Sequence, residues 1–175
     1  MTIWTSLRLY KHVLALALAT ALVTACQQTE PARYQLMLGT VCSVNAYEDG
    51  TAALYDRLFS RPRQIEKTFS LQDSDSELNA INTAAGSGPV AISKDMYTVL
   101  SAALSLAEAS DGALNPAIGP LVRLWGIQTA HARVPSSEEI AAVLPLCDWH
   151  DILLDSQTVF LRKAGMILDT GAIAK

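Results

Sequence analysis

Two segments of the sequence combine residue types that suit a flat, phosphorylated ligand. Between Ser110 and Val122, two glycines and two prolines stiffen a loop that is otherwise apolar, and Leu-Trp-Gly follows at residues 124–126. A loop that is both stiff and apolar suits a flat ligand lying against the backbone. It equally suits a buried connection packed under Trp125. Composition alone leaves both interpretations open.

The second of these segments runs from Asp169 to Lys175 (Asp-Thr-Gly-Ala-Ile-Ala-Lys). An acid at the end of a strand, a permissive Gly171 and a following lysine can hold the phosphates of a nucleotide together with a metal ion. The alternative is that Asp169 only caps a turn.

A weaker signal lies in Leu38-Gly39-Thr40. Here a glycine interrupts a predicted strand, which is where a ligand or another backbone can approach closely. A β-bulge is the commoner cause of such a glycine.

A cluster of acids lies within residues 69–78, and Asn82 follows it. Asp73, Asp75 and Glu77 resemble part of a metal-binding loop, but the calcium-loop pattern with its central glycine is absent. We therefore expect a solvated acidic turn with a helix cap at Ser76.

Composition argues against several functional classes. The net charge is −4 and no basic stripe is present, which argues against nucleic-acid binding. No Ser/His/Asp order is convincing, and no Cys/His cluster has the spacing of a zinc site. We interpret His131 and His150 as surface or structural residues and assign no catalytic residue. Cys42 and Cys147 either form a disulfide outside the cytoplasm or remain two isolated buried thiols.

The elements that must position these segments are of mixed type. Apolar spacing predicts a helix over residues 52–69 that is broken near Pro62. Ser93 predicts the cap of a helix over residues 94–109, and Ser136 with Glu139 forms a capping-box pattern.

Strands are expected between and after these helices. Residues 34–47 predict a strand pair or one long bent strand, and residues 151–155, 158–162 and 166–169 predict three short strands. The mixture is typical of the α+β class rather than of a regular βαβ alternation.

The first 33 residues predict an export signal and a lipid anchor. Residues 1–25 combine an early positive charge, a short apolar stretch and small residues before Cys26, which is typical of a signal peptide ending in a lipobox. The alternative is an ordinary secretory signal with a chance cysteine. We expect Cys26 to carry lipid, residues 26–33 to form a polar tether, and the protein to lie on the periplasmic side of the cell inner membrane.

Taken together, the four segments resemble the ApbE family of FAD:protein FMN transferases. The family pattern has Met-Gly-Thr near the mature start and a Ser…Asp-Ser-Glu…Asn stretch. Next comes Ser-Asp-Gly-Ala-(Phe/Leu)-(Asp/Asn)-Pro-x-x-Gly-Pro-Leu-Val-x-x-Trp-Gly, and then Asp-x-Gly-Ala-Ile-Ala-Lys-Gly. Order and rough spacing agree from Leu38 to Lys175. This sequence departs at Leu38 (usually Met), at Gln72 (often aromatic) and at Asn115 (frequently Asp).

The resemblance implies a fold and an activity. The fold would be an α+β, T-fold-related mixed sheet with flanking helices. The activity would be Mg²⁺-dependent transfer of FMN from FAD to a threonine or serine of a target protein, with release of AMP. By the same resemblance, Ala172 gives its backbone carbonyl to Mg²⁺. The flavin nucleotide would be lined by Leu38, Gln72, Ala113, Leu114, Asn115, Asp169 and Lys175.

The resemblance covers only the earlier part of the family pattern. The family's later His-containing stretch and Asp-Ala-x-x-Thr segment, which supply other Mg²⁺ ligands, are absent from the sequence. We therefore expect residues 34–175 to be the N-terminal part of a flavin transferase domain. Two alternatives stay open: a flavin-binding lipoprotein without transfer activity, and a chain that does not fold alone.

Overall fold

The computed structural model describes residues 31–48, 50–127 and 129–173. Cys26, Lys175 and the predicted signal peptide lie outside these residues. The chain divides into two compact units, Met1–Ser60 and Arg61–Lys175, and each is described by itself. Over the described ranges, no helix combines the length and apolar character that crossing a membrane requires.

The described part of the first unit begins with a β-hairpin. Strand β1 (Arg33–Met37) pairs antiparallel with β2 (Thr40–Val44), and Met37 lies opposite Thr40. Leu38 and Gly39 form the two-residue turn with φ of 55° and 70°, because two positive φ values match the right-handed twist of the strands. Residues 34–47 are therefore a strand pair, and Gly39 belongs to its turn rather than to a bulge.

The hairpin buries one face against the helix that follows it. Met37 packs with Tyr55 and Phe59 of α2 (Ala52–Phe69), and the Tyr55 hydroxyl accepts a hydrogen bond from the amide of Ala46 at 3.1 Å. Helix α2 is continuous, so the predicted break near Pro62 is wrong. Proline removes the partner of the carbonyl four residues earlier. That carbonyl belongs to the exposed Leu58, where water can replace the lost bond.

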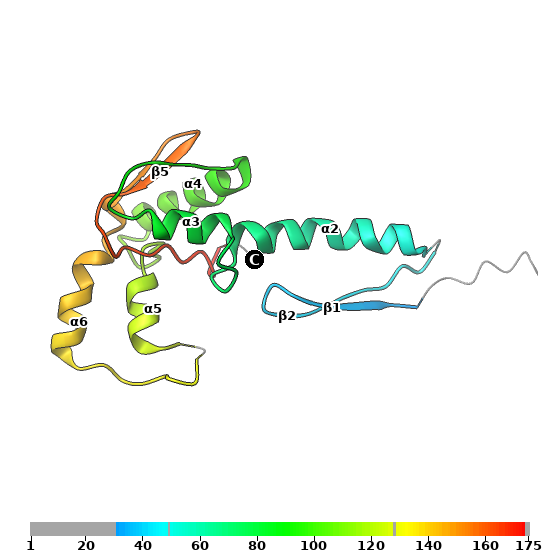
Figure 1. The fold of residues 1–175 in the computed structure, drawn as a ribbon, viewed down its shortest axis with the longest axis horizontal. Coiled ribbons are helices and arrows are strands. Elements are labelled where there is room, and N and C mark those ends of the chain that lie inside the picture. Colours follow the sequence, from blue (N-terminus) through cyan, green and yellow to red (C-terminus); the bar gives the residue numbers. More distant parts are fainter. Residues whose placement is uncertain (1–30, 49, 128, 174–175) are drawn as a thin grey trace, which may run out of the picture. The chain divides into compact units, whose positions relative to one another are not determined.

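The second unit is α+β, as predicted from the sequence (Figure 1). Its helices are the end of α2, α3 (Glu77–Thr83), α4 (Lys94–Ala109), α5 (Gly119–Trp125), α6 (Ser137–Val143) and the 3₁₀ turns η1 (Leu144–Leu146) and η2 (Trp149–Asp151). Its strands are β3 (Val90–Ala91), β4 (Ile152–Leu154) and β5 (Thr158–Leu161), which form an antiparallel sheet in the order β3-β5-β4. Ser76, Ser93 and Ser136 cap α3, α4 and α6, and Glu139 completes the predicted capping box.

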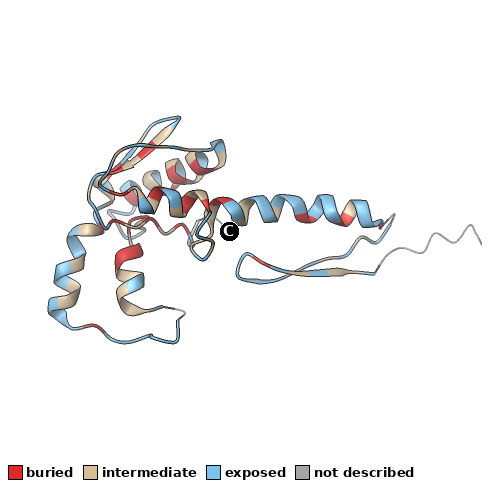
Figure 2. Cartoon of the chain, in the orientation of Figure 1, coloured by how far each residue is buried: buried red, intermediate tan, exposed pale blue. Residues whose placement is uncertain are grey.

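The core of the second unit lies between α3, α4 and the sheet. Figure 2 shows buried residues along α3 and α4 and at the start of α5. The fully enclosed side chains come from α3, α4, the sheet, the loop before α5 and the last described segment: Leu78, Ile81, Met96, Leu100, Ala117, Val159, Leu161, Met166 and Leu168. The residues directly before Asp169 are thus built into the core.

One predicted strand is not a strand. Residues 166–169 are extended but join no sheet. Their backbone groups form hydrogen bonds to a side chain and to a loop instead. They therefore lack the regular ladder of hydrogen bonds to a neighbouring strand that defines a strand. Those bonds form the candidate site described next.

Candidate functional site

The loop after α4 takes its shape from its own polar side chains. The Ser110 hydroxyl donates to the Leu106 carbonyl at 2.7 Å and accepts from the Leu114 amide at 3.0 Å. Asn115 accepts from the amide of Ala117 at 2.8 Å through Oδ1 and donates through Nδ2 to the Cys147 carbonyl at 2.6 Å. These bonds replace regular structure, so the loop is stiff without being a helix or strand.

This loop and the Asp169 segment lie side by side. The Gly119 amide donates to the Ile167 carbonyl at 3.2 Å, and the Asp169 amide donates to the Pro116 carbonyl at 2.9 Å. A Cβ at residue 119 would lie 2.5 Å from Cγ2 of Ile167 and 2.6 Å from its carbonyl oxygen. Only glycine permits this approach, because those distances are shorter than van der Waals contact.

Asn82 attaches the same segment to α3. Its Oδ1 accepts from the Leu168 amide at 2.7 Å, and its Nδ2 donates to the Leu168 carbonyl at 3.1 Å. Leu168 itself is fully buried. One side chain therefore satisfies both backbone groups of a core residue that has no strand partner.

The acidic segment forms a loop closed by hydrogen bonds rather than a metal site. Asn79 Nδ2 donates to the carbonyls of Ser70, Leu71 and Asp73 at 2.8–3.3 Å, and the Ser76 hydroxyl donates to the Ser70 carbonyl at 2.6 Å. The acidic side chains of this segment pair with neighbouring residues. Lys67 hydrogen-bonds to Asp73 and lowers its pKa. The acidic turn with a cap at Ser76 is confirmed.

An open groove of about 520 Å³ lies where these segments meet. Its walls come from the acidic loop, the start and end of α5, the stretch after α5, and the last described segment. The lining residues are Leu71, Gly119, Val122, Arg123, Leu124, Gly126, Ile127, Thr129, His131, Arg133, Ile167 and Asp169. An apolar groove with a few convergent polar groups is the usual form of a small-molecule site.

The far end of α5 is fixed by a glycine. Gly126 ends the helix in the left-handed conformation with φ of 62°, and its amide bonds to the Arg123 carbonyl at 3.1 Å. A Cβ there would also lie 2.7 Å from the His131 carbonyl oxygen. The chain therefore turns back on itself at Gly126 and carries residues 129–133 to the groove.

One charged pair in the groove is held firmly. Both guanidinium nitrogens of Arg133 donate to the Glu139 carboxylate, at 2.8 and 2.7 Å, and the Ser136 amide donates to the same carboxylate at 2.8 Å. The bonds from Arg133 and then from Ser136 lower the pKa of Glu139 to about 2. The pair thus links the groove wall to the start of α6.

The residues predicted to line the flavin lie at different positions relative to the groove. Asp169 is half-buried in the groove, and its Oδ1 accepts from the Gly171 amide at 2.9 Å. Gln72 is exposed beside the groove residue Leu71, Ala113 is exposed, and Leu114 and Asn115 are half-buried in the loop before Gly119.

Two predicted residues are placed elsewhere or not at all. Leu38 lies in the hairpin turn of the first unit, and Lys175 is outside the described residues. The assignments to the flavin stay predictions.

Sequence reasoning missed several groove residues. Val122 and Arg123 lie within the α5 segment, at or beside the variable positions of the family pattern, so that pattern gave no reason to choose Arg123. His131 is exposed, as predicted, yet it lines the groove together with Thr129 and Arg133. No motif marks these three residues, because only the turn at Gly126 brings them to α5.

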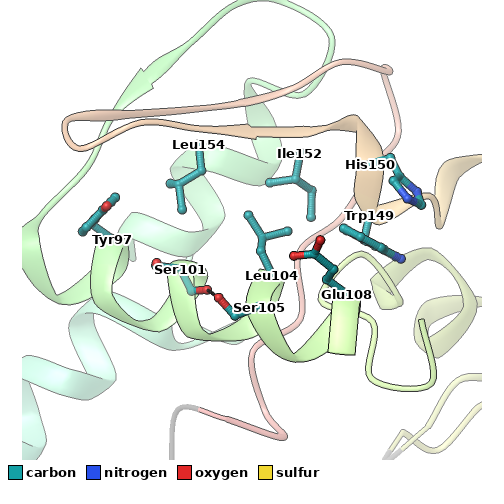
Figure 3. A pocket seen from close by; sticks show the side chains of 9 residues that line it. All are labelled: Tyr97, Ser101, Leu104, Ser105, Glu108, Trp149, His150, Ile152 and Leu154. Carbon is teal, nitrogen blue, oxygen red and sulfur yellow. Dashed lines mark hydrogen bonds between the residues drawn. The ribbon is translucent and has the colours of Figure 1, made fainter. Parts of the chain in front are cut away.

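A second hollow, of about 400 Å³, lies between α4 and β4 (Figure 3). Tyr97, Ser101 and Leu104 of α4 face Ile152 and Leu154 of β4 across it. Trp149 stacks on His150 at one end, with ring centroids 3.8 Å apart. None of the four segments contributes to it, so the candidate site is the groove at α5.

The described residues do not make a Mg²⁺ site by themselves. Ala172 is exposed in a turn closed by the bond from the Ile173 amide to the Thr170 carbonyl, and Asp169 is the one acid in this segment. Across the described part of the chain, no three His, Cys, Asp or Glu side chains come together in the manner of a metal site. Mg²⁺ prefers octahedral oxygen coordination with carboxylates, and one carboxylate and one carbonyl are a poor set.

The two cysteines among the described residues are free thiols. Cys42 lies half-buried in the hairpin, and Cys147 is buried beside the Asn115 loop. Burial raises the pKa of the Cys147 thiol. This pair therefore forms no disulfide, and of the two thiols that the alternative prediction expected to be buried only Cys147 is.

Comparison with known proteins agrees with the motifs. The model of the ApbE family matches residues 38–175. The FAD:protein FMN transferase of Treponema pallidum is 39% identical over 157 residues, covering 83% of this chain and 43% of that protein. The FAD:protein FMN transferase of Klebsiella pneumoniae is 38% identical over 125 residues, covering 70% of this chain and 40% of that protein.

Solved structures agree in fold. The flavin transferase ApbE from Vibrio cholerae superposes with a TM-score of 0.72 at 26% identity, over 82% of this chain and 48% of that one. The ApbE protein from Thermotoga maritima gives a TM-score of 0.70 at 29% identity, over 82% and 48% of the two chains. The chain thus spans less than half the length of these relatives.

Proposed function

Since this chain belongs to the ApbE family, we propose that the protein transfers FMN from FAD to a threonine or serine hydroxyl of a target protein. In this reaction, the hydroxyl oxygen forms a bond to the phosphorus of the FMN half. The pyrophosphate P–O bond breaks, AMP leaves, and the hydroxyl proton is released. The reaction mainly needs positioning and stabilisation of negative charge.

The observation that carries the proposal is the groove at α5. The Asn82, Gly119 and Asp169 segments are joined there by four backbone-directed hydrogen bonds of 2.7–3.2 Å. Two segments far apart in sequence therefore form one preformed wall of the groove, and Asn82 of α3 holds one of them in place through Leu168. A preformed wall lowers the conformational cost of holding a dinucleotide.

The described residues suit the binding of a nucleotide more than the chemistry itself. Leu71, Val122, Ile127 and Ile167 give apolar surface for a flat ring, and Arg123 and Arg133 give positive charge. Mg²⁺, when bound, would neutralise charge on the pyrophosphate. We infer that Ala172 gives its carbonyl to that ion and that the remaining ligands are not among the described residues.

A direct test mixes the full chain with FAD, Mg²⁺ and a target peptide that bears a threonine. We expect a peptide carrying one FMN group, detected by in-gel flavin fluorescence and mass spectrometry, and an equal amount of AMP. The same peptide with alanine in place of the threonine is the control. A chain that binds FAD but leaves the peptide unmodified would contradict transfer.

That contrary result would favour a second function, flavin binding without transfer. The apolar and positively charged residues of the groove serve binding alone, which gives this alternative physical support. Retention of intact FAD after dialysis, with no AMP formed, is its expected signature.

We further propose that Cys26 carries lipid and anchors the protein on the periplasmic side of the inner membrane. The short apolar stretch before Val-Thr-Ala-Cys supports this location. Cys26→Ser should move the protein from the membrane fraction to the soluble periplasmic fraction. Unchanged membrane association of this variant would refute the anchor.

A further inference from the structure

The groove at α5 places arginine side chains together on an acidic protein. The whole chain has a net charge of −4. The groove is lined by two arginines and a histidine against one carboxylate, that of Asp169. An arginine of such a groove that is not engaged by a carboxylate can bind an anionic ligand.

The two arginines differ in their availability. Arg133 is engaged by both oxygens of Glu139, and Glu139 is in turn part of the α6 capping box. Arg123 is exposed, and no hydrogen bond or ion pair joins its guanidinium to another described residue. Among the described residues, Arg123 is thus the groove arginine that pairs with no acid.

The position of Arg123 is well defined although its side chain has no protein partner. It lies in the last turn of α5. The Gly119–Ile167 bond fixes the first residue of this helix and the Gly126 turn fixes its end. The simplest structural role for an arginine in the last turn of a helix is a favourable interaction of its charge with the helix C-terminus. That role does not explain why the side chain lines a groove.

We propose that Arg123 binds the pyrophosphate of FAD in this groove, an assignment that rests on the proposed function. A guanidinium presents two parallel N–H donors that match a phosphate group. The neighbouring apolar residues Val122, Ile127 and Ile167 then cover a ring of the same nucleotide. Arg123 thereby selects a dinucleotide over a flavin that carries no phosphate.

The test compares ligands with and without phosphate. The full chain, purified in detergent, is titrated with FAD and with riboflavin, and flavin fluorescence gives the two dissociation constants. We expect Arg123→Ala to weaken FAD binding about tenfold, the usual scale of one charged hydrogen-bonding pair, and to leave riboflavin binding unchanged. Arg123→Lys should retain part of the FAD affinity, because it keeps the charge but loses the fork.

Arg162→Ala is the matched control. It removes an exposed arginine of the same unit that lies outside the groove, where it pairs loosely with Asp151 at 3.8 Å. Neither dissociation constant should change in this variant. Thermal unfolding followed by circular dichroism checks that Arg123→Ala keeps the parent's stability, as expected for a side chain with no protein partner.

The outcomes separate the two proposals. FAD binding that is insensitive to Arg123→Ala overturns the assignment of Arg123 and leaves the proposed function standing. Equal losses for FAD and riboflavin also overturn it, because they indicate general damage to the groove. Failure of the unchanged chain to bind FAD overturns both.

Discussion

The side-chain amide of Asn82 forms a two-way hydrogen-bonded pair with the backbone of Leu168, 86 residues away. Leu168 N donates to Oδ1 at 2.7 Å, and Nδ2 donates to Leu168 O at 3.1 Å. In a sheet, a neighbouring strand would supply both bonds. Here a single helical residue supplies them, and Asp169 follows directly at the edge of the groove.

Replacing Asn82 should therefore be costly. Asn82→Ala removes two hydrogen bonds and leaves the buried backbone of Leu168 unpaired, so we expect a loss of about 2–4 kcal/mol in the free energy of unfolding. Asn82→Asp should lose a similar amount, because it places an oxygen against the Leu168 carbonyl. Urea denaturation measures both. Asn45→Ala, at an exposed asparagine, is the control, and equal stability of the Asn82 and Asn45 variants would contradict the role of the pair.

Gly119→Ala should separate the loop from the last segment. The new Cβ would lie 2.5–2.8 Å from three atoms of Ile167, and overpacking of this kind costs about 1–3 kcal/mol. We expect lower stability by denaturant titration together with weaker FAD binding, because α5 begins at this residue. Gly171→Ala is the comparison, since among the described residues its Cβ would meet the Asp169 side chain, at 3.1 Å, and no backbone atom within 4 Å outside its chain neighbours. A Gly119→Ala chain as stable as the Gly171→Ala chain would refute the steric argument.

Glu139 should make the stability of the folded protein depend on pH. Its folded-state pKa of about 2 is below the ordinary value of 4.5, so its contribution is present above about pH 4.5 and is lost as the pH falls towards about 2. Glu139→Gln should flatten the decline in unfolding temperature between pH 6 and pH 3. Arg133→Gln should do the same by removing the main cause of the shift. Parallel pH profiles for parent and variants would argue against this linkage.

Leu38 should show stability and binding changing in opposite directions. It holds φ of 55° in the hairpin turn and is 45% exposed. Asparagine tolerates the left-handed region better than leucine, so Leu38→Asn should gain up to about 1 kcal/mol. If the family resemblance correctly assigns Leu38 to the flavin, FAD binding weakens in the same variant. Leu36→Asn, in an extended strand, controls for the loss of an apolar side chain and should bring no stability gain.

Local signals predicted the capped elements well. The caps at Ser76, Ser93 and Ser136 depend on residues three positions apart, so the sequence alone identifies them. The break predicted at Pro62 failed because a missing hydrogen bond is tolerated where the orphaned carbonyl is exposed. The strand predicted over residues 166–169 is absent because a strand needs a neighbouring strand. The hydrogen-bond partners of these residues are a side chain and a loop.

The sequence by itself determined the α+β class, the family resemblance and the segments that carry the flavin pattern. All of these depend on residue types at short, fixed spacings. Only the tertiary structure decided that Gly119 and Asp169 line one groove and that Asn82 holds the segment before Asp169, because hydrogen bonds between distant segments leave no periodic signal. It likewise decided that Arg133 is neutralised by Glu139 while Arg123 is not. Which of two arginines can meet a phosphate depends on where their neighbours fold, and no spacing in the sequence encodes that.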